Sequence, residues 1–379
     1  MTVRLIIVAL AWLWASAAAE PLKVDGLPLP VELSLPSNHD PAKSWPAVFF
    51  YHGMGGHPTT KMIREQTGAK DWIVVGMAYT QPGAFKYSPE NLAKEIAVMH
   101  QVRDQLAKTK GLDPKRVYVS GFSMGGWVTS MFFQADRSLA GAAILGAGHM
   151  IEVEPKLGPL KAETPLFLGV GRKDGNYPFS LKAKLYYGRL GATVRMETWD
   201  GLGHEFPKEG SPGLKEWFAL RKGGTPDAAA MEAEYAKIGK LAPRQEWRAL
   251  LEFRERPYVN EPGQVWLEKI KTRIGELEVI SEVAGESKAY KRHRQLLADE
   301  MAATTLPQLV KVQKGYEALV PEAGEGEEVD LIVTDLKRLT TLVENFEAQL
   351  AEKQAQQPKP EPVPLPKRDR QVPRNPMVR

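Results

Sequence analysis

Cysteine is absent from the 379-residue sequence. Its absence excludes disulfides, a thiolate nucleophile, thiolate metal ligands and a lipid anchor attached through cysteine. An excess of one charge is also missing, because 50 lysine and arginine residues are balanced by 46 aspartate and glutamate residues, for a net charge of +4. We therefore expect no nucleic-acid partner. What is present, 43% hydrophobic and 25% charged residues, is typical of a folded protein with a sizeable core.

The N-terminal apolar run is too short to cross a membrane. Arg4 precedes apolar residues from 5 to 14, about half of the ~20 residues that a membrane-spanning helix requires. Ala17 and Ala19 then form the small-x-small pattern that precedes a cleavage point. Residues 1–19 are therefore predicted to be a signal peptide, with a retained anchor as the alternative. We expect export to the periplasm or the medium, without stable membrane insertion.

From residue 20 to residue 224, short apolar runs alternate with segments of helical period. The expected strands are 22–24, 31–35, 47–51, 72–77, 117–120, 142–145, 166–170 and 194–199. Most are continuously apolar, which favours an α/β fold with a mostly parallel sheet and helices on both faces. The clearest helix has Ser88 as its N-cap, Pro89 at its first position and Gly111 at its end.

Strand-like runs disappear after residue 224, and charged, helix-forming residues replace them. Candidate helices cover 227–240, 243–254, 262–283, 286–302, 305–318 and 327–353. Residues 225–356 are therefore predicted to form an all-helical domain. The last segment, 357–379, is rich in proline and basic side chains, and we expect a disordered tail there.

The helix expected at 327–353 carries apolar residues at alternating spacings of three and four. They are Val329, Ile332, Leu336, Leu339, Val343, Phe346 and Leu350. Such a seam packs against another helix. That helix could belong to the same chain, in a bundle, or to a partner, so self-association or a protein partner through 327–353 stays open.

Ser123 is the central residue of a G-x-S-x-G motif at 121–125. An expected strand runs directly into the motif, and a helical segment follows it. In this setting the motif predicts a nucleophile elbow, a sharp strand-to-helix turn that presents the serine and leaves no room for neighbouring side chains. The alternative is a glycine turn with an incidental serine.

A serine hydroxyl needs a base within hydrogen-bond reach before it can act as a nucleophile. His204 is the preferred candidate, because it lies in the glycine-rich segment 201–206 just after the last expected strand. His149 is the rival. It precedes the acid candidate and so breaks the order serine, acid, histidine along the chain.

The histidine in turn needs a carboxylate to hold it in the right tautomer. Asp174 follows the penultimate strand and gives the order serine, acid, histidine. The alternative is a plain turn residue, because Asp-Gly-Asn is good turn chemistry. Glu152 and Glu154 are the next candidates, and Asp200 is less favoured because it shares a loop with His204.

Acyl transfer also needs N–H donors for the developing oxyanion. The amide of Met124 is the first candidate, since this residue follows the nucleophile. The second donor is expected in the glycine-rich loop 52–56, from Met54, with Gly53 as the alternative.

The motifs HGMGG, GFSMGG, GRKD and GLGH together resemble the α/β-hydrolase superfamily. Residues 31–222 are most similar to carboxylesterases related to acyl-protein thioesterases, and to the polyhydroxybutyrate depolymerase and feruloyl esterase group. The resemblance implies ester hydrolysis through an acyl-enzyme, with Ser123, Asp174 and His204 as a catalytic triad and with no metal or organic cofactor. It does not extend to the helical region.

The expected substrate is a small ester or an ester-bearing polymer. About twenty residues separate Leu145 from Leu166, too few for a large cap over the site. A serine peptidase acting through the same triad and a non-catalytic binding protein with a hydrolase fold are the alternatives.

Overall fold

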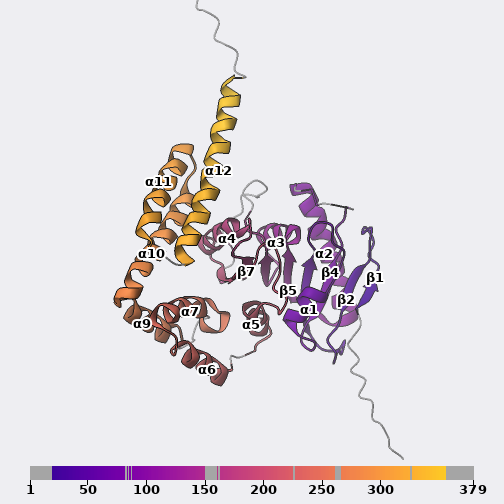
Figure 1. Cartoon of the computed structure of the whole chain (residues 1–379). Helices are drawn as coiled ribbons and strands as arrows, with labels where there is room; N and C mark the ends of the chain where they lie inside the picture. The colour runs from indigo at the N-terminus through magenta and orange to yellow at the C-terminus, as the bar shows by residue number, and fades with distance from the viewer. Residues whose placement is uncertain are drawn as a thin grey trace, which may run out of the picture. The chain divides into compact units, whose positions relative to one another are not determined.

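The computed structural model describes residues 19–149 except 82, 84 and 87, residue 160, and residues 163–224, 227–260, 266–324 and 327–355. The predicted signal peptide, apart from its last residue, and the tail lie outside these residues, as do Glu152 and Glu154. The chain divides into two compact units, Met1–Val283 and Ala284–Arg379. Figure 1 labels helices and strands of both units.

The first unit contains one eight-stranded sheet with the order β1-β2-β4-β3-β5-β6-β7-β8 (Figure 1). The strands are β1 (Glu20–Leu22), β2 (Val31–Ser34), β3 (Trp45–Tyr51), β4 (Ile73–Met77), β5 (Leu112–Phe122), β6 (Gly141–Leu145), β7 (Pro165–Gly171) and β8 (Thr193–Trp199). β2 is antiparallel to β1 and β4, and the remaining pairs are parallel. The predicted mostly parallel sheet is confirmed.

Five helices pack on the sheet. They are α1 (Lys61–Thr67), α2 (Pro89–Lys110), α3 (Met124–Ala135), α4 (Tyr177–Arg189) and α5 (Pro212–Arg221). Successive side chains of a strand point to opposite faces. In β3, Phe49 therefore joins an apolar cluster with residues of α2, α3 and α4, whereas Phe50 joins a second cluster with residues of α1 and α5. Both faces are covered, as predicted.

Four further helices also belong to the first unit: α6 (Ala228–Ile238), α7 (Pro243–Glu255), α8 (Pro257–Asn260) and α9 (Trp266–Glu278). Ion pairs tie them to the helices of the sheet. Arg256 contacts Glu216 of α5, and Glu255 lies 2.9 Å from Lys184 of α4. The division of the chain into two units falls between residues 283 and 284, whereas the sequence pattern predicts a boundary after residue 224. The composition changes at residue 224, but helices beyond this residue still contact α4 and α5.

The second unit is a helical bundle of α10 (Ser281–Ala302), whose first turn still belongs to the first unit, α11 (Leu306–Glu322) and α12 (Glu327–Ala355). Ile332, Leu339 and Val343 of the α12 seam are buried in a cluster with residues of α10 and α11. Phe346 and Leu350 are 43% and 44% exposed. A bundle within the chain thus covers the first part of the seam, and association of its last part with a partner stays a prediction.

The helix predicted at 262–283 is interrupted. α9 ends at Glu278 and α10 begins at Ser281, with a turn in which the Ile280 amide donates to the Leu277 carbonyl at 3.0 Å. Over the ranges that the structure describes, no helix is both long and apolar enough to cross a membrane.

Candidate active site

Ser123 lies at the turn between β5 and α3, where the G-x-S-x-G motif predicts it. Its backbone has φ 58° and ψ −120°. Few residues other than glycine adopt positive φ, so this backbone is strained. The Ser123 amide donates to the Leu145 carbonyl of the neighbouring strand β6 at 2.9 Å. The serine is thus fixed at the carboxyl end of the parallel strands.

The glycines around the serine are required by close backbone contacts. A Cβ atom at Gly125 would lie 1.9 Å from the carbonyl oxygen of Tyr51, at the end of β3. A Cβ atom at Gly121 would lie 2.3 Å from the carbonyl carbon of Gly125. Carbon atoms in contact are normally ~3.5–4.0 Å apart, so a side chain at either position would displace α3 from the sheet.

His204 and Asp174 form a hydrogen-bonded chain with Ser123. His204 Nε2 lies 2.7 Å from Ser123 Oγ, and His204 Nδ1 lies 2.8 Å from Asp174 Oδ2. The Asp174 side chain is 2% exposed, whereas the His204 side chain is 43% exposed. A neutral imidazole has one donor and one acceptor nitrogen. Nδ1–H therefore donates to the buried carboxylate, and Nε2 accepts from the serine hydroxyl.

Asp174 is a turn residue as well, and the two arrangements use different oxygen atoms. Oδ1 accepts a hydrogen bond from the Asn176 amide at 2.8 Å, while Oδ2 faces His204. The turn chemistry of Asp-Gly-Asn therefore orients the carboxylate toward the histidine.

The loops that follow β7 and β8 are joined through their backbones. The Lys173 amide donates to the Leu202 carbonyl at 2.8 Å. A Cβ atom at Gly171 would lie 2.1 Å from the carbonyl oxygen of Gly203, so only glycine permits this approach. The loops that carry Asp174 and His204 are consequently fixed to each other.

Both predicted oxyanion segments border the serine. Met124 is the first residue of α3, where backbone amides have no partner within the helix. A Cβ atom at Gly53 would lie 3.3 Å from Ser123 Cβ, so the 52–56 loop passes directly beside the serine. The Met54 side chain is 71% exposed. The donation of these amides to an oxyanion stays a prediction.

The rival residues have other contacts. The His149 ring is buried and stacks on Tyr186, with ring centroids 3.6 Å apart, and burial lowers the pKa of His149 to about 4. Asp200 is paired with Arg172, at 2.5 Å between Oδ1 and Nε. His204 is the histidine that reaches Ser123.

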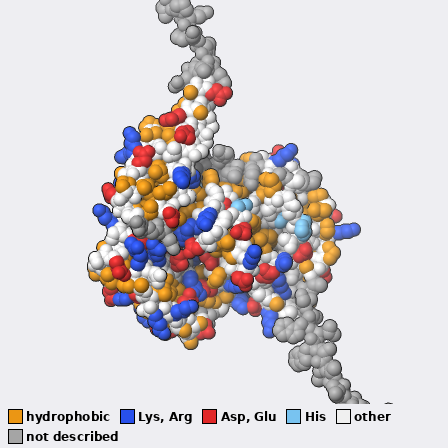
Figure 2. Space-filling view, in the orientation of Figure 1, with side chains coloured by type: hydrophobic (Ala, Val, Ile, Leu, Met, Phe, Trp, Pro, Cys, Tyr) orange, Lys and Arg blue, Asp and Glu red, His pale blue; other side chains and the backbone are white. Residues whose placement is uncertain are grey.

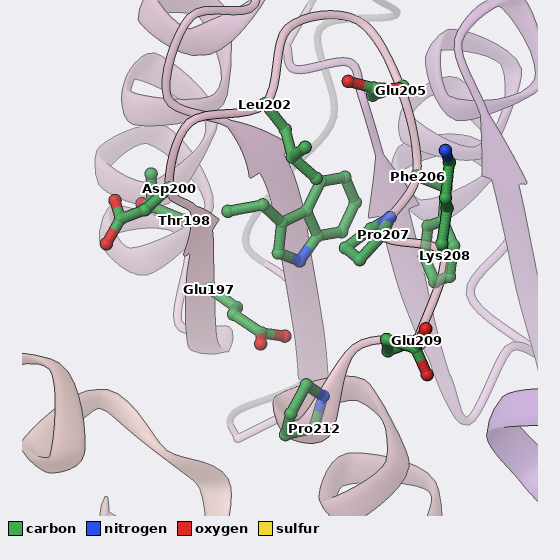
Figure 3. Close-up of a pocket in the computed structure, with 12 residues that line it drawn as sticks. Glu197, Thr198, Asp200, Leu202, Glu205, Phe206, Pro207, Lys208, Glu209 and Pro212 are labelled. Carbon is green, nitrogen blue, oxygen red and sulfur yellow. The ribbon is translucent and has the colours of Figure 1, made fainter.

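Some surroundings of the histidine were not predicted. The Phe122 ring lies 5.3 Å from the His204 ring, at an angle of 30°. A hollow of about 540 Å³ lies along the loop after β8, and its lining includes Glu197, Trp199 and Phe206 (Figure 3). No motif marks either feature, because both depend on where the loop turns after its strand.

Charged side chains of both signs are interspersed on the visible surface (Figure 2), in keeping with the small net charge. Among the described residues, no group of three histidine, aspartate or glutamate side chains is placed to hold a metal ion.

The strand order, the antiparallel β2 and the strained serine between β5 and α3 define the α/β-hydrolase fold that the motifs predicted. No family model and no curated protein matches the sequence.

Among solved structures, the chain is similar to a carboxylesterase from Bacillus cereus, with 19% identity, 50% of this chain and 93% of that chain covered, and a TM-score of 0.41. A carboxylesterase from Mesorhizobium loti has 20% identity, coverage of 53% and 98%, and a TM-score of 0.43. A phospholipase/carboxylesterase from Dyadobacter fermentans has 15% identity, coverage of 51% and 93%, and a TM-score of 0.38.

Proposed function

We propose that this protein is a serine hydrolase that cleaves carboxylic esters through an acyl-enzyme intermediate. The observation that carries the proposal is the hydrogen-bonded chain from Ser123 through His204 to the buried Asp174. The strained backbone at the serine supports it, because strain of this kind persists where it serves a function.

In the proposed reaction, Ser123 Oγ attacks the ester carbonyl carbon while His204 Nε2 takes the hydroxyl proton. The Asp174 carboxylate holds the imidazole in position and stabilises its charged form. The amides of Met124 and Met54 donate to the oxyanion. His204 then returns the proton to the leaving alcohol, and a water molecule, deprotonated by the same nitrogen, releases the acid from the serine.

The proposed substrate is a small ester or an ester-bearing polymer. The half-buried serine and the exposed edge of His204 are reachable from solvent without passage through the core. This favours substrates whose ester group is itself accessible.

The decisive experiment is hydrolysis of a short-chain aryl ester by Ser123→Ala. We expect kcat/KM to fall on the order of 10⁴-fold or more, because the nucleophile is lost while the fold is kept. Ser120→Ala is a matched control. It removes a buried hydroxyl from β5, the strand that leads to Ser123, and this hydroxyl donates to the Ala143 carbonyl and not to His204. Undiminished turnover by Ser123→Ala would contradict the proposal.

The same assay separates the alternatives. Faster cleavage of peptides than of esters by the wild type would favour a serine peptidase on the same three residues. Failure of the wild type to hydrolyse esters or to react with a fluorophosphonate would favour a non-catalytic binding protein.

We also propose that the protein is exported after removal of residues 1–19. The support is the charged start, the short apolar run and the small residues before Glu20. The intact mass of protein recovered from the periplasm or the medium should correspond to a chain that begins at Glu20. A mass that retains Met1 would contradict cleavage.

A further inference from the structure

Arg172 connects three parts of the first unit near the histidine. It directly follows β7 and precedes Asp174 by two residues. Its Nε atom lies 2.5 Å from Asp200 Oδ1, in the loop that carries His204. Its Nη2 atom lies 3.7 Å from Glu252 Oε1, in α7.

The Arg172 side chain is suited to connect the histidine loop with α7. It is 24% exposed, and the backbone amide of the same residue donates to the Trp199 carbonyl at 3.0 Å. Burial lowers the pKa of Arg172, but the hydrogen bond to Asp200 and the nearby acidic groups outweigh it and raise the pKa overall. The guanidinium therefore stays charged. It donates a hydrogen bond to the Asp200 carboxylate and lies within ion-pair distance of the Glu252 carboxylate.

The histidine loop borders a hollow on one side. The hollow of about 540 Å³ extends along residues of the segment 197–212. Figure 3 shows the side chains of Leu202 and Phe206 around this hollow, while the Asp200 carboxylate points away from it. Close packing fixes the position of most loop atoms in proteins. Leu202 and Phe206 pack against the second apolar cluster, whereas the Asp200 end of the loop is held by its ion pair with Arg172.

Helix α7 offers a firm anchor for the second contact. Trp247, Leu250 and Phe253 are buried along its inner face, each at most 2% exposed. α7 also packs on β8, the last strand of the sheet, and Glu255 at its end pairs with Lys184. The backbone of α7 is thus fixed relative to the strand from which the histidine loop departs, and the Glu252 side chain that it carries toward Arg172 is 63% exposed.

We propose that Arg172 is a positioning residue for the proposed ester hydrolysis. By linking Asp200 to Glu252, it holds the His204 loop so that Nε2 stays within hydrogen-bond distance of Ser123. Helix α7, which lies beyond the segment that resembles hydrolases, thereby supports the reaction. This inference rests on the proposed function.

The test compares Arg172→Ala with Arg103→Ala. Arg103 forms a similar ion pair, 2.8 Å from Asp104, with 17% of its side chain exposed, but on α2. We expect Arg172→Ala to lower kcat about 10- to 100-fold with KM nearly unchanged, as removal of groups that orient reactive side chains does elsewhere. Arg103→Ala should change kcat less than about 2-fold, as expected for a surface pair.

Two further variants test the role of geometry. Arg172→Lys keeps the charge but not the fork of donors, so we expect only part of kcat to return. Glu252→Gln removes the contact with α7 alone, and we expect kcat to fall about 2- to 5-fold, the effect of a partly exposed ion pair. An unchanged kcat in Glu252→Gln would overturn the assignment to α7.

The outcomes separate this inference from the proposed function. If the wild type neither hydrolyses esters nor reacts with a fluorophosphonate, the proposed function is wrong. If the wild type reacts and Arg172→Ala retains its kcat, the inference alone is wrong. The inference would also be overturned if Arg172→Ala and Arg103→Ala lowered the melting temperature equally and lost kcat to the same extent. Melting temperatures of all variants are measured beside the kinetics.

Discussion

Each of the two units contains a histidine bonded to carboxylates, and the two histidines differ in their remaining contacts. In the first unit, His204 bonds one carboxylate and one serine hydroxyl, and 43% of its side chain is exposed. In the second unit, His293 is fully buried between two carboxylates. Its Nδ1 lies 2.5 Å from Glu328 and its Nε2 lies 2.8 Å from Asp335.

The group that faces the second ring nitrogen of each histidine distinguishes a reactive arrangement from a structural one. Both ring nitrogens of His293 face acceptors, and only the charged imidazolium can donate from both. The contacts with both carboxylates therefore favour the charged form of His293. His204 has one acceptor nitrogen facing a hydroxyl, so it can take and return a proton. The comparison predicts that equivalent changes in the two units affect different properties.

The largest expected effect comes from Asp174→Asn. We expect kcat to fall about 10⁴-fold, because an amide can hold the imidazole in the wrong tautomer and cannot stabilise its charge. The free energy of unfolding should change little, since Asn keeps the shape and can still accept from the Asn176 amide. Steady-state kinetics on an aryl ester and urea unfolding measure both quantities. If Asp174→Asn lowered the free energy of unfolding enough to explain its loss of kcat, the distinction between the two histidines would not hold.

A smaller effect, on a different property, is expected from the matched change Asp335→Asn. Asp335 accepts from His293 and lies 3.3 Å from Arg338, so the amide loses one charged hydrogen bond and one ion pair. We expect the second unit to lose about 1–3 kcal/mol of stability, the usual value of charge-assisted hydrogen bonds, with kcat unchanged. Urea unfolding and ester hydrolysis are compared on the same preparation. A fall in kcat would show that the two units are not separate in function.

Local patterns predicted the sheet and the hydrogen-bonded chain of the site. Continuous apolar runs indicated the buried strands, and the motif around Ser123 indicated the turn that the structure contains. Ser123, Asp174 and His204 follow β5, β7 and β8, and they come together because parallel strands end at the same edge of the sheet.

Contacts between distant helices could not be predicted in the same way. His293 meets its two carboxylates across 35 and 42 residues of sequence, and no spacing marks such a pair. Arg256 likewise pairs with Glu216 and joins helices on both sides of residue 224. These contacts depend on how helices pack after they form, so composition gave a boundary that packing does not follow.

The surroundings of His293 determine a prediction for pH. Burial lowers the pKa of His293, but the hydrogen bonds to Asp335 and Glu328 raise it more, so its pKa in the folded protein is raised. Arg294 lies beside the ring, 3.2 Å from Nδ1. From the other helices, burial raises the pKa of Tyr316, which therefore stays neutral. Arg338 stays charged, because its bonds to Glu300 outweigh burial and raise its pKa. His293 is then the group of this cluster whose charge changes with pH, at a pKa above its ordinary value.

The smallest expected effect follows from that titration. The His293 pKa is higher in the folded state than the value of ~6.5 expected when unfolded. Its contribution to stability is therefore complete below about pH 6.5 and is lost as pH rises through the folded pKa, at about 1.4 kcal/mol for each unit of difference. Urea unfolding followed by helical circular dichroism should show the second unit weakening over this range. His293→Gln should flatten the profile, and a variant with the same slope as the wild type would assign the titration to another group.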